Sequence, residues 1–218
     1  MSVVLFTQIL ALALGALLAV ALLRRLRDTQ ARRAAAFEDF AEGRGLTLYR
    51  IPGTEALYRL TDAAGTLMTV EAAPRTSRNG TKMPGTVSLT LPAPRLSRGF
   101  VALVVPGTDR PGTRLDQALR GVARGSETPE IRHLGDALAF LSEVPAGESP
   151  DLAVLLEALR DPALRPDPGG RAMIALNAEG LHLRLGRTIK DPGALAPILD
   201  TLRRLQHRLD AGPRRQAA

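Results

Sequence analysis

Three histidines are the side chains of this chain best suited to acid–base chemistry or to metal binding. His133 lies between two carboxylates, and on a helix the spacing of Glu130, His133 and Asp136 would bring the three side chains near one another. A carboxylate beside an imidazole can tune it as a general base. The same spacing is typical of the solvated flank of a structural helix, so both interpretations stay open.

Sequence signatures of catalysis and cofactor binding are missing. The chain has no H-E-x-x-H pair, no G-x-S-x-G and no G-x-x-x-x-G-K-[ST]. It has no cysteine, which excludes disulfides, thiolate metal ligands and a cysteine nucleophile. We therefore predict no cofactor, no metal site and no catalytic residue. A site built from scattered Asp, Glu and Arg remains the alternative.

An apolar run at the N-terminus dominates the chain. Residues 3–23 read VVLFTQILALALGALLAVALL and carry no charge. As a helix they would span roughly the 30 Å of a bilayer core. A cleaved signal peptide needs a basic stretch before the run and a small-x-small cleavage site, and both are missing here. A buried core helix is the other alternative, but the length of the run favours a transmembrane anchor over residues 1–23.

A basic collar follows the anchor, within RRLRDTQARR at residues 24–33. Because Lys and Arg stay on the cytoplasmic side of a membrane, the collar predicts an external N-terminus and a cytoplasmic domain at the inner (plasma) membrane. The lipid bilayer is therefore an expected partner, attracted by five arginines: Arg24, Arg25, Arg27, Arg32 and Arg33.

The charge distribution argues against nucleic acid as a partner. The net charge is +7, but residues 24–33 contribute five Arg and one Asp, and Arg214 and Arg215 extend the excess into the tail. The rest of the chain is nearly neutral, and aromatic residues are few. We predict no nucleic-acid binding.

Small residues recur along one face of the expected anchor helix, at Ala11, Gly15 and Ala19. Such a face lets two helices approach closely and would support a homodimer. An alanine-rich composition can produce the same spacing by chance.

The helix should continue past the anchor as a stalk over residues 24–43 and end at Gly43, a suitable left-handed cap. Phe37, Phe40 and Ala41 fall on one face near this end, so we expect that face to pack on the domain.

The next part of the chain predicts strands. Thr86–Leu91 alternates apolar and polar residues, and 100–105 is apolar throughout, as in a strand covered on both faces. Further strands are expected at 46–50, 56–60, 67–71, 172–177 and 181–185, the last two as a hairpin. Type II turns are expected at four Pro-Gly-Thr tripeptides, which begin at Pro52, Pro84, Pro106 and Pro111, and a tight turn is expected at 78–81.

Helical patterns follow in the second half. Thr128-Pro129-Glu130 has the character of a helix start, and the apolar spacing of Ile131, Leu134, Leu138 and Leu141 predicts a helix that ends before Pro145. Further helices are expected at 115–122, after Ser149-Pro150-Asp151, and at 194–211, with Pro197 in the first turn of the last one.

Together these patterns predict an α+β protein: a transmembrane helix, then one domain over 44–212 with a mainly antiparallel sheet, a helical layer and a C-terminal hairpin plus helix. Residues 213–218 would be a disordered basic tail. The leading functional hypothesis is a membrane-tethered interaction or assembly domain with a protein partner or a second copy. The alternatives are an enzyme for a membrane-proximal substrate, and a domain that binds lipid or an apolar ligand.

Overall fold

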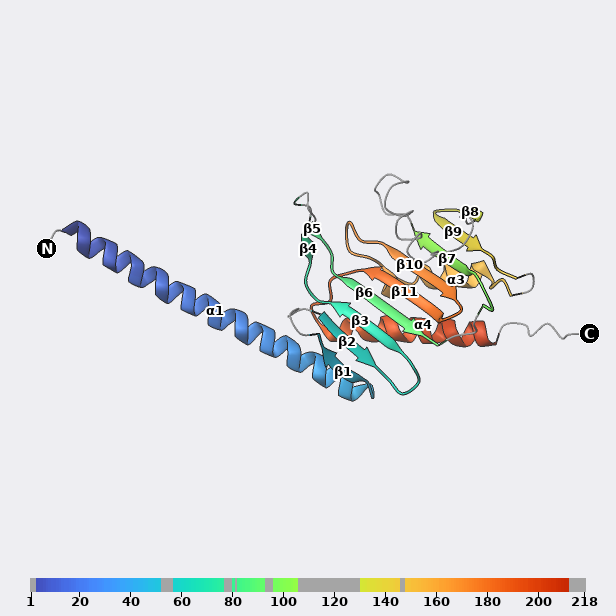
Figure 1. The fold of residues 1–218 in the computed structure, drawn as a ribbon, viewed down its shortest axis with the longest axis horizontal. Helices are drawn as coiled ribbons and strands as arrows, with labels where there is room; N and C mark the ends of the chain where they lie inside the picture. The colour runs from blue at the N-terminus through green and yellow to red at the C-terminus, as the bar shows by residue number, and fades with distance from the viewer. Residues whose placement is uncertain are drawn as a thin grey trace, which may run out of the picture.

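The N-terminal helix stands apart from the rest of the molecule (Figure 1). The computed structural model describes residues 3–51, 57–76, 80, 82–92, 96–105, 130–145 and 148–211; the side chains of residues 3–7, 9 and 75 are outside this description. Helix α1, Val3–Gly43, is continuous and packs on the domain only through its last turns. Ala34, Phe37 and Ala41 are buried there, and the Phe37 ring stacks on Tyr58. The predicted docking face at the end of this helix is thus confirmed.

Helix α1 ends at Gly43, as predicted, but the left-handed glycine that caps it is Gly45 and not Gly43. Gly45 has φ 64°, whereas Gly43 is still helical. The Gly45 N–H donates to the Glu42 carbonyl and the Leu46 N–H to the Ala41 carbonyl, the two bonds of a Schellman motif. The motif reverses the chain, and Leu46 is buried in the core.

Nine strands form one antiparallel sheet in the described part of the chain, in the order β1-β2-β3-β6-β11-β10-β7-β9-β8. The C-terminal hairpin β10–β11 thus lies in the middle of the sheet, between β6 and β7. A separate pair, β4–β5, has the register Arg75 opposite Met83 and Thr76 opposite Lys82; the tight turn predicted at 78–81 lies outside the described residues except for Gly80. The strands are β1 Thr47–Arg50, β2 Leu57–Thr61, β3 Leu67–Glu71, β4 Arg75–Thr76, β5 Lys82–Met83, β6 Thr86–Leu91, β7 Phe100–Val105, β8 Glu130–Leu134, β9 Ala137–Ser142, β10 Ala172–Asn177 and β11 Gly180–Gly186.

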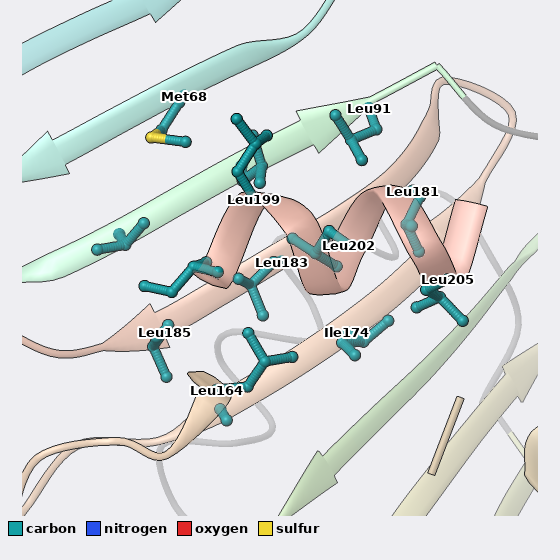
Figure 2. Close-up of a cluster of buried hydrophobic side chains, with 14 of the residues drawn as sticks. Met68, Leu91, Leu164, Ile174, Leu181, Leu183, Leu185, Leu199, Leu202 and Leu205 are labelled. Atoms are coloured by element: carbon teal, nitrogen blue, oxygen red, sulfur yellow. The ribbon is translucent and has the colours of Figure 1, made fainter. Parts of the chain in front are cut away.

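Helices cover one face of this sheet. Helix α4, Leu195–Asp210, lies across β6, β11 and β10, and packs leucines against theirs (Figure 2). Helix α3, Leu152–Leu159, and the short turns η1, Pro162–Leu164, and η2, Pro192–Ala194, complete the layer. Pro197 lies in the first turn of α4, where its missing N–H costs nothing. The large hydrophobic core therefore lies between sheet and helices.

The sheet is buried on both faces at β7. Val101 and Leu103 point into the main core, whereas Phe100, Ala102 and Val104 join a second cluster with Phe140 and Ala175. This confirms the prediction from the continuous apolar run at 100–105. It also explains why β9 is buried along most of its length.

The helix predicted from residue 130 is wrong: β8 and β9 form a hairpin instead. Gly135 and Asp136 make its two-residue turn, with φ 67° at Gly135, the first turn position, as in type II′ turns. Residues 137–142 are buried on both faces beside β7, so their apolar spacing carries no strand period. The apparent helical stripe arose from two strands read as one element.

Of the four Pro-Gly-Thr tripeptides, the one that begins at Pro84 lies within the described residues. Gly85 is not among the described glycines with positive φ, so the type II turn predicted at Pro84 is wrong. A side chain at Gly85 would overlap the Glu71 carbonyl, and its N–H donates to the Thr188 hydroxyl at 2.9 Å. The other predictions on 52–56, 106–129 and 212–218, including three turns, the helix at 115–122 and the disordered tail, lie outside the described residues.

The cap assignment predicts opposite effects from two neighbouring substitutions. Gly45→Ala should lower the free energy of unfolding by about 1–2 kcal/mol, because alanine is strained in the left-handed region. Gly43→Ala should raise it by up to about 1 kcal/mol, because Gly43 is helical and space for a Cβ is open. Urea unfolding measures both, and effects of the same sign would contradict the assigned cap.

Candidate functional site

Half of the sheet face opposite the helices carries polar side chains. On β1, β2, β3, β6 and β11 this face holds mostly Thr, Ser, Tyr and Arg. The strand register places one residue of each strand in a single row: Tyr49, Arg59, Thr69, Ser88 and Arg184. We call this row the open-face row. Tyr49 and both arginines are exposed, and the two hydroxyl residues are half-buried.

The open-face row is basic. Neither Arg59 nor Arg184 has an acidic partner among the described residues, whereas Arg50 and Arg132 of the same sheet are held in ion pairs. Three strand spacings separate the two, or about 14 Å. Two guanidinium groups at this separation, with hydroxyls between them, could bind two carboxylates of an extended partner.

His182 lies in the neighbouring row of the same face, because it alternates with the buried Leu181 and Leu183 along β11. Its Nε2 is 2.9 Å from the Asn177 side-chain oxygen, and its Nδ1 is 3.1 Å from the Thr90 hydroxyl. The Asn177 oxygen also accepts the backbone N–H groups of Glu179 and Gly180. Since this oxygen only accepts, Nε2 carries the proton, and the Thr90 hydroxyl donates to Nδ1.

These contacts make His182 a structural residue. Burial lowers its pKa below the usual range, although Glu179 opposes the effect. Both ring nitrogens are occupied, so neither is free to take a proton from a substrate. The trio closes the β10–β11 turn and links it to β6. The alternation of His182 with Leu181 and Leu183 indicates the face of the imidazole, but no local signal in the sequence could indicate Thr90 as its partner.

The cluster predicted around His133 does not form. Glu130 and His133 lie on opposite faces of β8, because side chains alternate along a strand. Glu130 binds the Arg132 guanidinium at 2.7 Å, and Asp136 pairs with Arg160 of the α3 C-cap. Hydrogen bonds from these arginines lower the pKa of both carboxylates. The hypothesis of a general base at this place is therefore wrong.

Two carboxylates that the sequence analysis missed attach α4 to the rest of the domain. Burial would raise the pKa of Asp62 and of Asp161, but hydrogen bonds and nearby arginines hold both below the ordinary value. Asp62 accepts the Thr66 N–H at 2.8 Å and lies 3.4 Å from Arg203. Asp161 caps η1 and accepts the Thr201 hydroxyl at 3.0 Å. Asp161-Pro162 is a helix-start signal that could have indicated this cap.

No group of three or more metal-ligating side chains comes together in the described part of the chain. The prediction that the protein needs no metal and no cofactor is not tested by this finding. The described ion pairs join one element to another, apart from the Glu130–Arg132 pair within β8.

The residues predicted to act in the membrane lie on the projecting part of α1. Ala11, Gly15 and Ala19 are exposed, and no heavy atom lies within 4 Å of a Cβ built at Gly15. The collar arginines 24, 25, 27 and 32 are exposed, and Arg33 is half-buried where docking begins. Among the residues searched, no helix has the length and the hydropathy required to cross a bilayer. The transmembrane prediction for residues 1–23 therefore stays a proposal.

Comparisons with known proteins add no function. No protein-family model, no curated protein and no solved structure matches this chain.

The His182 trio predicts a pH dependence of stability. Its pKa in the folded state lies below its unfolded value of about 6.5. The unfolded state therefore binds more protons, so the stabilisation is complete above about pH 6.5 and decreases as the pH falls below it. His182→Gln should remove this component from urea unfolding curves measured between neutral and mildly acidic pH.

The control variant for this experiment is His207→Gln, at an exposed position on α4. Its pH profile should parallel that of the wild type. A His182→Gln profile that also parallels the wild type would contradict the neutral, hydrogen-bonded imidazole.

Proposed function

We propose that this chain is a single-pass membrane protein whose domain after residue 43 is a cytoplasmic interaction or assembly module. One observation carries the proposal: α1 exposes large apolar side chains on all its sides, well away from the domain. Leu12 is 75% exposed and Leu17 is 70% exposed, and the remaining members of the set are Leu10, Leu14, Leu18, Val20, Leu22, Leu23 and Leu26.

Burial of these apolar side chains would lower the free energy of the protein. Each large apolar side chain gains roughly 1.5–3 kcal/mol when it is removed from water. A helix that is apolar all round belongs in a membrane or inside a bundle. The charge-free run of residues 3–23 has the length of a span, and the five arginines that follow favour a cytoplasmic domain.

The open-face row supports an interaction role for the domain. It offers Arg59 and Arg184 at a fixed separation on a sheet whose opposite face forms the core. Two arginines without an acidic partner in the described structure suit an acidic protein partner, and the acid nearest to them on this face is Glu71, two residues from Thr69 on β3. The exposed face at Gly15 would support a second copy of the chain through helix packing, as the sequence analysis expected.

The membrane proposal is tested by topology. A reporter that is active only in the cytoplasm, fused after Ala218, should be active, and the domain should resist protease added to spheroplasts. The protein should also stay in the membrane fraction after alkaline extraction. Release by alkali, or digestion of the domain from outside, would contradict the proposal.

The interaction role is tested with the same membranes. Cross-linking should capture a protein with wild-type chain and lose it when Arg59→Ala and Arg184→Ala are combined. Arg165→Ala is the matched control, because Arg165 is exposed next to η1, away from the open-face row. Equal capture by all three proteins would exclude the open-face row as the contact.

A further inference from the structure

The direction of β1 shows which end of the sheet lies nearest the projecting part of α1. The chain reverses at Gly45, so β1 runs back along the last turns of the helix. The Arg50 guanidinium binds the Glu38 carboxylate at 2.5 Å, which joins the end of β1 to a helical turn well before the cap. We call the sheet end at Arg50 the anchor-side end.

The antiparallel register brings the β4–β5 hairpin to this end. Arg50 is opposite Tyr58, Tyr58 is opposite Val70, and Val70 is opposite Val87. The connection from β3 to β6, which contains β4 and β5, therefore leaves the sheet at the anchor-side end. Figure 1 shows this hairpin on the side of the domain from which α1 projects.

At full extension, the chain between β3 and the hairpin would reach as far along α1 as the arginines of the basic collar. The strand register places Val70 at the same position along the sheet as Arg50. Because Arg50 pairs with Glu38, this position corresponds to Glu38 on α1. The six residues that follow Val70 up to Thr76, with a bend at Ala73, cover at most about 20 Å. At about 1.5 Å per residue, α1 needs roughly 13 residues for the same distance, which leads from Glu38 back to Arg25.

The composition of the hairpin suits anionic headgroups. Residues 72–84 contain Arg75, Arg78 and Lys82 and no acid. Lys82 is exposed, and Met83 beside it is an exposed apolar side chain. The only other lysine of the chain, Lys190, is exposed on the loop after β11, at the same sheet end.

Exposed glutamates lie on the turns at the opposite end of the sheet, at Glu143, Glu148 and Glu179. The separation of charge is partial, because Arg98 is exposed at that end, and Asp136 and Asp191 are exposed at the anchor-side end. An anionic surface would favour the hairpin, which carries no acid, over the turns that carry the glutamates.

We propose that the β4–β5 hairpin is a second membrane contact: it lies against the anionic lipid surface of the bilayer that holds α1, with Lys82 at the phosphates and Met83 at the headgroup boundary. The contact rests on the proposed membrane anchoring. It holds the domain at two points, α1 and the hairpin, so the domain cannot rotate freely about the helix. The open-face row then points in a fixed direction relative to the membrane.

The test uses the absence of native cysteine. The full chain carries one fluorophore at Met83→Cys, Leu14→Cys or Ala178→Cys, and is reconstituted into phosphatidylcholine vesicles with or without phosphatidylserine. Lipids spin-labelled at the headgroup or along the acyl chain quench the fluorophore. Ala178, exposed on the β10–β11 turn at the far end of the sheet, is the matched control.

We expect headgroup quenching at Met83→Cys in phosphatidylserine vesicles, much less without the anionic lipid, and none at Ala178→Cys. Lys82→Gln should lower the ratio of docked to undocked hairpin about fivefold, since one basic residue near the surface contributes roughly that factor. Equal quenching at Met83→Cys and Ala178→Cys, with Leu14→Cys quenched by the acyl-chain probe, would overturn the hairpin contact alone. A Leu14→Cys label that the acyl-chain probe does not quench would contradict the membrane anchor itself.

Discussion

The insertion of the β10–β11 hairpin between β6 and β7 is the constraint on which the rest of the structure depends. It joins strands from the first half of the chain to strands from the middle, so neither part of the sheet is complete without residues 172–186. Leu183 and Ile174 of this hairpin are buried under α4, which follows it directly (Figure 2). Stability therefore depends on contacts between distant segments, and such contacts form late and cooperatively.

The polar contacts among the described residues hold this arrangement of strands and helices together. Asp62 and Asp161 hold α4 from two sides, His182 closes the central hairpin onto β6, and Arg160 joins the end of α3 to the β8–β9 turn. Each carboxylate in these contacts has a pKa below its ordinary value, so each contributes stability above the unfolded pKa that is lost as the pH falls through the folded one. Arg59 and Arg184, on the open face of the described sheet, take part in none of these contacts.

Elements with one buried face could be predicted from the sequence, because their apolar residues recur at a regular spacing. Alternation at Thr86–Leu91 and the 3.6-residue spacing of α4 correspond to elements with one buried face, and both were confirmed. The failure at 130–142 has the opposite cause: β9 is buried on both faces, so its apolar residues carry no period, and Gly135-Asp136 was a turn signal that should have divided the segment. Strand order and the Thr90–His182 contact join residues far apart in the chain, and one sequence holds no signal for such pairs.

Helix α1 divides at about residue 33 into a part that belongs to the domain and a part that does not. Every buried hydrophobic residue in the described structure lies at Ala34 or beyond it. We infer that the domain is complete from that point and that the earlier apolar residues serve the proposed membrane anchor.

This inference is tested by comparing the full chain with a chain that begins at Arg32, by sedimentation without detergent and by urea unfolding. We expect the shorter chain to be monodisperse and to unfold in one cooperative transition, whereas the full chain should stay dispersed only in detergent. A shorter chain that aggregates or lacks a cooperative transition would contradict it, and so would a full chain that stays monodisperse without detergent.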